Sequence, residues 1–353
     1  MGDADVTAVP AKAAPRTRSR RRRLLLGAIG VTSVVLTFAF VLPRIADYRD
    51  VWQQLEQMSW ADLAALLGAT VLNVLTFAPP WMAALPALTF RQALAMTQAS
   101  TAVSIVSPAG AAVGMASSYA MLRSWGFPGD GVGLAVTLTG IWNQLASFAF
   151  PTLALATLFV AGEPHAVLQP VAAVGLAVLV AIVVSLALVL RSDRQARWIG
   201  DLVARLADRG LWAVRRGPVI WTGESFVRFR QAAATLLRRR WHVLTLATLA
   251  GHLTVFIVLL LSLRAVGVPA SQVSLSEAFA AWALVRALGA IPIAPGGIGV
   301  VELALTGALV GFGGNNAGVV AGVLVYRGLT ILPTLGLGLL AGATWRHHAP
   351  KRT

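Results

Sequence analysis

The chain has 353 residues, of which 57% are hydrophobic and only 12% are charged. A soluble domain cannot bury that much apolar surface in one core, so the composition excludes an ordinary soluble protein. Several apolar runs reach the length of about 18–20 residues that a helix needs to cross roughly 30 Å of hydrocarbon. The sequence therefore predicts an all-α, polytopic integral membrane helical bundle.

The formal net charge is +15. Basic residues concentrate in three hydrophilic places that flank apolar runs, at 16–23, 191–240 and 346–352. This distribution is the positive-inside pattern of membrane proteins, and it favours contact with anionic lipid headgroups. No nucleic-acid-binding fold is recognisable, so we expect no nucleic-acid partner.

Cysteine is absent from the sequence, which excludes disulfides, thiol catalysis and cysteine metal sites. His347 and His348 are adjacent rather than spaced as metal ligands. The glycines of PGGIGVVE follow no strand, so a dinucleotide-binding loop is not predicted. With no catalytic constellation visible, we expect neither an enzyme nor a cofactor or metal.

Residues 1–23 are basic and lack apolar periodicity, which predicts a disordered cytoplasmic tail. Residues 24–345 are predicted to form one transmembrane domain, and 346–353 a second cytoplasmic tail. The first apolar run is too long for a typical signal peptide and is interpreted as an uncleaved span. The predicted spans are 24–42, 61–88, 132–160, 166–190, 241–264 and 317–345.

Two further apolar segments, 92–122 and 276–311, are broken near their middles, and each half is too short to cross alone. The breaks contain Pro108 and Gly110 in the first segment, and Pro295, Gly296 and Gly297 in the second. Such non-helical backbone survives at membrane depth only inside protein or beside a wet cavity. We therefore predict two broken, re-entrant helical hairpins.

The arginines indicate whether each broken segment crosses the membrane an odd or an even number of times. If 92–122 crossed once, the 12 arginines of 191–240 would lie outside, against the positive-inside rule. With two re-entrant hairpins, 24 of the 29 lysines and arginines lie inside, together with both termini. A helical hairpin that crosses the membrane twice would leave the flanking segments on the same sides, so the arginine count does not distinguish it from a re-entrant hairpin.

The two breaks are 187 residues apart, and the same offset aligns the neighbouring spans. The units 61–160 and 241–345 each read as span, broken hairpin, span, which predicts an inverted repeat joined by the cytoplasmic basic loop 191–240. Chance similarity among apolar segments is the alternative. Within the loop, residues 198–206 predict an amphipathic helix, either at the membrane interface or packed on the protein's own cytoplasmic face.

Three ionisable residues are predicted at membrane depth, where each costs about 2.5–3.5 kcal/mol on insertion scales. They are Arg286 and Glu302, on the two halves of the second hairpin, and Arg327 in the last span. A Glu–Arg pair would lower the cost of both groups, and an arginine left over would attract a phosphate. The alternatives are a purely structural pair for Arg327 and a side chain of Arg286 that extends to the surface.

Neutral polar groups in the spans give weaker indications. Asn143 and Gln144 are expected to bridge helices, and His252 to be a hydrogen-bonded structural group rather than a proton relay.

The segments APGGIGVVELALTGALVGFG and AGVLVYRGLTILPTLGLG resemble the membrane region of the lysylphosphatidylglycerol synthase family and its stand-alone flippase-like relatives. The resemblance extends over roughly residues 24–345. Two departures from the family pattern leave the identity of the lipid open. The first hairpin carries no charge, whereas relatives often have one there, and Trp81 follows Pro80 where relatives commonly have an arginine before the tryptophan. The matching positions are Pro295, Gly296, Gly297, Gly299, Glu302 and Arg327. We expect these residues, together with Arg286, to line the path of the lipid.

The resemblance implies a plasma-membrane protein that moves a phospholipid or polyprenyl-linked lipid between leaflets, with membrane lipids bearing an anionic or phosphate headgroup as partners. Because the soluble aminoacyltransferase domain is not in this sequence, we expect no synthesis of aminoacyl lipids. The alternatives are a non-catalytic accessory subunit of a lipid- or cell-wall-modifying membrane enzyme and, less favoured, a membrane-embedded glycosyltransferase-like enzyme. A wet cavity at Glu302 favours transport, a dry core with a satisfied ion pair favours the subunit, and an acidic cluster favours the enzyme.

Overall fold

In the computed structural model the described part of the chain is helical and contains no β-strand. The structure describes residues 48–107, 110–160, 169–195, 197–198, 223–288 and 297–345. Its main helices are α2 (Tyr48–Glu56), α3 (Trp60–Thr76), α4 (Pro79–Ala84), α5 (Phe90–Val106), α6 (Gly110–Ser124), α7 (Gly129–Val160), α8 (Gln169–Arg191), α10 (Gly223–Ala265), α11 (Leu275–Leu288), α12 (Val300–Gly311) and α13 (Asn316–Thr344).

The protein is a polytopic helical membrane protein. Four helical stretches among the described residues are long and apolar enough to cross a bilayer: Trp60–Ala84, Gly129–Ala156, Val227–Ala265 and Asn316–Thr344. They correspond to four of the predicted spans, and α8 lies where a fifth was predicted. The predicted span 24–42 and both terminal tails lie outside the described residues.

Helix α10 begins earlier than the sequence indicated. The predicted hydrophilic loop 191–240 is wrong in its last part, because residues 223–240 are the first turns of α10, which is about 64 Å long. Its arginines lower the local hydropathy, but Ala233, Leu237 and Leu244 form a buried stripe in a cluster with residues of α7. Most of the predicted amphipathic helix 198–206 lies outside the described residues.

Each broken segment forms two short helices that pack against each other. Helices α5 and α6 are about 26 and 22 Å long, and α11 and α12 about 21 and 18 Å, so none reaches across about 30 Å of hydrocarbon. Close backbone approach explains one glycine, because a Cβ on Gly110 would lie 2.2 Å from the carbonyl oxygen of Ser104. Pro108, Pro295 and Gly296 lie outside the described residues.

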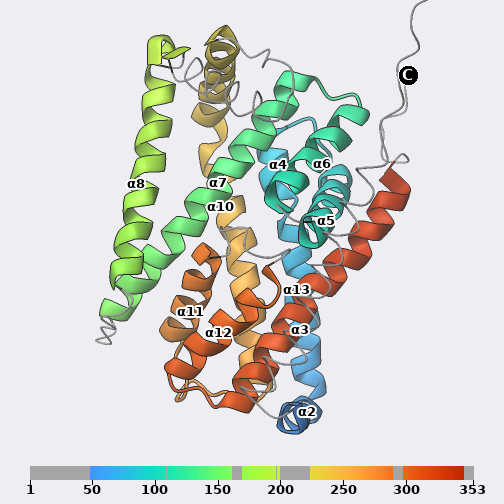
Figure 1. Cartoon of the computed structure of the whole chain (residues 1–353). Helices are drawn as coiled ribbons and strands as arrows, with labels where there is room; N and C mark the ends of the chain where they lie inside the picture. Colours follow the sequence, from blue (N-terminus) through green and yellow to red (C-terminus); the bar gives the residue numbers. More distant parts are fainter. Residues whose placement is uncertain are drawn as a thin grey trace, which may run out of the picture.

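The two hairpins open toward opposite ends of the bundle (Figure 1). Just after α6, Trp125 donates a hydrogen bond to the backbone oxygen of Trp345 at the C-terminal end of α13. Just before α11, Gln272 accepts one from Asn315 at the N-terminal end of α13. Because α13 is about 43 Å long, the hairpin bases lie far apart on opposite sides. An inverted repeat requires this arrangement.

Helix α13 packs against α5 through a glycine. A Cβ on Gly338 would lie 2.3 Å from the Cβ of Ala102 and 2.7 Å from the backbone oxygen of Gln98. We expect Gly338→Ala to lower the unfolding free energy by about 1–3 kcal/mol, because overpacking forces the helices apart. Thermal unfolding of the purified protein in detergent measures this change.

Gly342 on the same helix is the matched control, because nothing lies within 4 Å of an added Cβ there. Gly342→Ala should leave the melting temperature unchanged or slightly raised, since alanine favours helix over glycine. Equal melting temperatures for the two variants would show that the α5–α13 contact tolerates separation.

Candidate functional site

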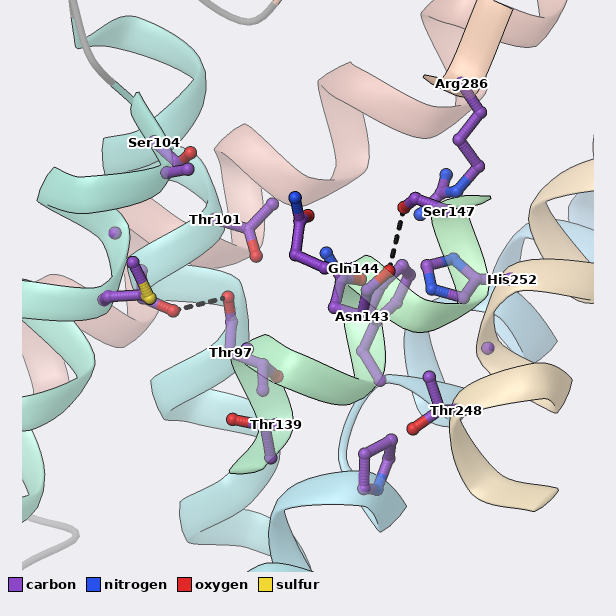
Figure 2. Close-up of a pocket in the computed structure, with 18 of the residues that line it drawn as sticks. Thr97, Thr101, Ser104, Thr139, Asn143, Gln144, Ser147, Thr248, His252 and Arg286 are labelled. Atoms are coloured by element: carbon purple, nitrogen blue, oxygen red, sulfur yellow. Dashed lines mark hydrogen bonds between the residues drawn. The ribbon is translucent and has the colours of Figure 1, made fainter. Parts of the chain in front are cut away.

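A cavity of about 990 Å³ lies between the first hairpin, α7, α10 and the second repeat unit. Its lining combines polar side chains from both units with aromatic and aliphatic ones. Figure 2 shows side chains from several helices converging on it. The cavity is therefore the place where the two predicted units meet.

Hydroxyl groups line the wall that belongs to the first hairpin. Thr97, Ser100, Thr101 and Ser104 all line the cavity from α5. They recur at the i, i+3, i+4 and i+7 spacing of one helix face, and α6 adds Ser118. We did not single out these residues from the sequence, although the spacing is visible there.

Asn143 and Gln144 project from α7 into the cavity (Figure 2). Both residues are exposed, and no hydrogen bond joins either side chain to another described residue. The expectation that they bridge helices is therefore wrong. Further along α7, Ala146 and Phe150 pack into the core.

His252 also differs from its prediction. Its side chain is 2% exposed, and neither ring nitrogen has a hydrogen-bond partner among the described residues. The ring packs edge-on against Phe150, with centroids 5.7 Å apart, and lines the cavity. The sequence favoured a hydrogen-bonded structural group, whereas the structure places an unpaired imidazole at the cavity wall.

Arg286 lines the cavity from α11 (Figure 2). Its guanidinium carbon lies 5.6 Å from the centre of the Trp282 ring, which is a cation–π contact. Its Nε is buried without a hydrogen-bond partner, and no carboxylate among the described residues pairs with it. The alternative that Arg286 extends to the surface is not what the structure shows.

Glu302 and Arg327 form the ion pair that the sequence suggested. The Arg327 Nε donates to Glu302 Oε1 over 2.6 Å, and the Glu302 side chain is 1% exposed. The other carboxylate oxygen, Oε2, accepts from the Gly299 amide over 2.7 Å and so caps α12. The Gly299 amide is therefore already occupied by a carboxylate. Arg327 lines the cavity, and Glu302 lies behind it.

The glycines of the motif produce the turn that precedes α12. Gly297 and Gly299 have φ angles of 65° and 90°, which other residues rarely adopt. This turn brings Glu302 onto the first turn of α12, where it reaches both Gly299 and Arg327. The local sequence thus positions the ion pair.

Residues 25–338 match the sequence family described as lysylphosphatidylglycerol synthase TM region. The chain belongs to this family. No individually curated protein matches the sequence. The motif residues by which the lysylphosphatidylglycerol synthase TM family was anticipated, Glu302 and Arg327, are the ones that pair at the cavity wall.

Proposed function

We propose that the protein is a lipid flippase that moves a phosphate-bearing lipid between leaflets, with the headgroup in the cavity and the acyl chains in the bilayer. The observation that carries this proposal is Arg286, a cation without a carboxylate partner among the described residues, which lines a cavity together with many uncharged polar side chains. Burying an unpaired charge is costly, so its presence indicates a ligand of opposite charge.

Phosphate suits this position because guanidinium groups bind it through two parallel hydrogen bonds. Arg327 lies on the same cavity with its Nε committed to Glu302. Glu302 thus fixes one arginine in place, while Arg286 remains available to the ligand. The expectation that Glu302 itself lines the lipid path gives way to a supporting role behind Arg327.

The hairpins support a transport mechanism by their placement. They open toward opposite ends of the bundle and border the same cavity (Figure 1). Many transporters bind substrate between inverted repeats and expose the site alternately to each side by rocking one unit against the other. A headgroup bound to Arg286 would be exposed in turn to the two leaflets.

Orientation follows from the arginines. Arg123 lies at the end of α6 beside Trp125, which contacts Trp345 at the end of α13. The arginine-rich beginning of α10 lies at the same end, because the other end of α10 meets the beginning of α13, where Val268 approaches Gly318. By the positive-inside rule we propose that this end faces the cytoplasm and that both terminal tails lie on the cytoplasmic side of the plasma membrane.

A leaflet-resolved assay in proteoliposomes tests the function. Fluorescent short-chain phosphatidylglycerol is incorporated in both leaflets, and an impermeant reductant destroys the label outside. We expect wild-type protein to expose nearly all of the label, whereas protein-free vesicles lose only the outer leaflet's share. Gly140→Leu should slow this exposure strongly, because Gly140 lines the cavity and leucine there would protrude into it.

Gly133→Leu is the matched control on the same helix. Nothing lies within 4 Å of a Cβ at Gly133, and this residue does not line the cavity. Its rate should equal that of the wild type. If the two variants transport equally fast, the cavity is not the lipid path.

The accessory-subunit function is the second candidate, favoured by the satisfied Glu302–Arg327 pair. A subunit of this kind would give no lipid movement in the wild-type protein alone. Among the described residues no group of three or more His, Cys, Asp or Glu is placed to hold a metal ion, so the glycosyltransferase-like function rests on no observed site.

A further inference from the structure

The cavity wall presents mainly hydrogen-bond acceptors. On α5, α6, α7 and α10, seven lining hydroxyls donate their single proton to a backbone carbonyl of their own helix, as Thr137 does to Gly133 over 2.8 Å and Ser147 does to Asn143 (Figure 2). A hydroxyl whose proton is committed still has lone pairs to offer. The seven are Thr97, Ser100, Ser118, Thr137, Thr139, Ser147 and Thr248.

The charges of the cavity are one-sided. Arg327 is balanced by Glu302, Arg286 is not balanced by any described carboxylate, and no aspartate or glutamate of the described segments lines the cavity. A cationic headgroup would lose its hydration beside Arg286 with no counter-charge to replace it. The lining therefore disfavours aminoacylated and choline headgroups.

Amide side chains add groups of both kinds. Asn143 and Gln144 are exposed within the cavity, and each offers donors and an acceptor to a ligand. The imidazole of His252, with both nitrogens unpartnered among the described residues, does the same. A headgroup that both donates and accepts hydrogen bonds would satisfy this wall.

From these observations we infer that the substrate is a phosphodiester lipid whose headgroup is a neutral polyol or sugar. The inference rests on the proposed lipid transport and names its substrate class. The phosphate pairs with Arg286, and the headgroup hydroxyls donate to the threonine and serine oxygens while the amides of Asn143 and Gln144 complete the set. Neutral hydroxyls supply donors to the many acceptor oxygens of the wall without adding positive charge.

Three fluorescent lipids with identical acyl chains test the inference in the same proteoliposomes. Phosphatidylglycerol has the phosphodiester charge and two headgroup hydroxyls, phosphatidylethanol has the same charge and none, and phosphatidylcholine adds a cation. We expect phosphatidylglycerol to move at least about tenfold faster than either of the others, since a site built around substrate hydroxyls rejects an analogue that lacks them.

Equal rates for phosphatidylglycerol and phosphatidylethanol, both faster than phosphatidylcholine, would overturn the polyol assignment and leave anionic lipid transport standing. Faster movement of phosphatidylcholine would overturn the substrate class altogether. If no lipid of the three moves, the proposed transport fails, and the inference fails with it.

A double variant tests whether hydroxyl and amide groups of the cavity wall cause the preference for phosphatidylglycerol over phosphatidylethanol. Thr137→Val with Gln144→Met removes one acceptor and one amide at nearly constant volume, and both residues line the cavity. The rate ratio of phosphatidylglycerol to phosphatidylethanol should fall to less than about threefold. Thr152→Val is the control, because Thr152 makes the same kind of bond to Phe148 on α7 but does not line the cavity. An unchanged ratio in the double variant would contradict recognition by these groups.

Discussion

Glu302→Gln is expected to destabilise the folded protein by about 3–5 kcal/mol, the usual cost of removing one partner from a buried ion pair. The Glu302 side chain is 1% exposed and that of Arg327 is 13% exposed, so the guanidinium would be left nearly buried without a counter-charge. Glutamine keeps an oxygen for the Gly299 amide, so the loss reports on the pair rather than on the cap. Thermal or denaturant unfolding in detergent measures it.

A double variant and a second carboxylate control this result. Glu302→Gln with Arg327→Gln removes both charges and should recover most of the lost stability, without restoring transport. Glu277 caps α11 as Glu302 caps α12, by accepting a hydrogen bond of 2.7 Å from the Ser274 backbone amide, but it has no arginine partner among the described residues. Glu277→Gln should therefore cost little. A Glu302→Gln protein as stable as the wild type would show that the pair contributes nothing to the fold.

Arg286→Gln is expected to reduce lipid transport at least about tenfold while the melting temperature stays equal or rises. Transport falls because the phosphate loses a charged, two-point partner. Stability does not fall because the wild type holds a cation whose Nε is buried without a partner, and removing it relieves that cost. Transport rates and thermal unfolding of the same preparations measure both effects.

Arg264→Gln should show the opposite behaviour. The Arg264 guanidinium donates to the backbone oxygens of Val268 and Val273 over 2.7 and 2.8 Å, which ties together the turn between α10 and α11. Losing these bonds should lower stability, while the folded fraction transports at the wild-type rate. If Arg286→Gln behaved like Arg264→Gln, Arg286 would be a structural residue and the proposed binding site would lose its main support.

The sequence was sufficient for the parts of the fold that depend on apolar length and on rare charges. Proline and glycine interrupt two apolar segments, and both segments form paired short helices. Glu302 was expected to pair with one of the two arginines because an apolar interior offers so few other partners, and it pairs with Arg327. In these cases one strong energetic term acts alone.

The sequence was insufficient where weak terms compete. The hydroxyl stripe from Thr97 to Ser104 was overlooked because serine and threonine in membrane helices usually bond to their own backbone, with no ligand involved. His252 was expected to form a hydrogen bond. Helices distant in sequence create a cavity beside it instead, and no described residue pairs with either ring nitrogen. The beginning of α10 was taken for a loop because its arginines hid an apolar stripe that packs against α7 and α4.

The short lengths of α11 and α12 also affect how the nascent chain is inserted into the membrane during translation. With 14 and 12 residues, neither helix can leave the translocon as an independent span, and each carries a charged side chain in its last or first turn. Glu302 lacks the arginine with which it pairs in the folded protein until Arg327, 25 residues later, has been made. At ordinary rates of translation this delay lasts about one to five seconds. During that interval the second hairpin must wait in a polar environment, and α13 completes its insertion by delivering the arginine.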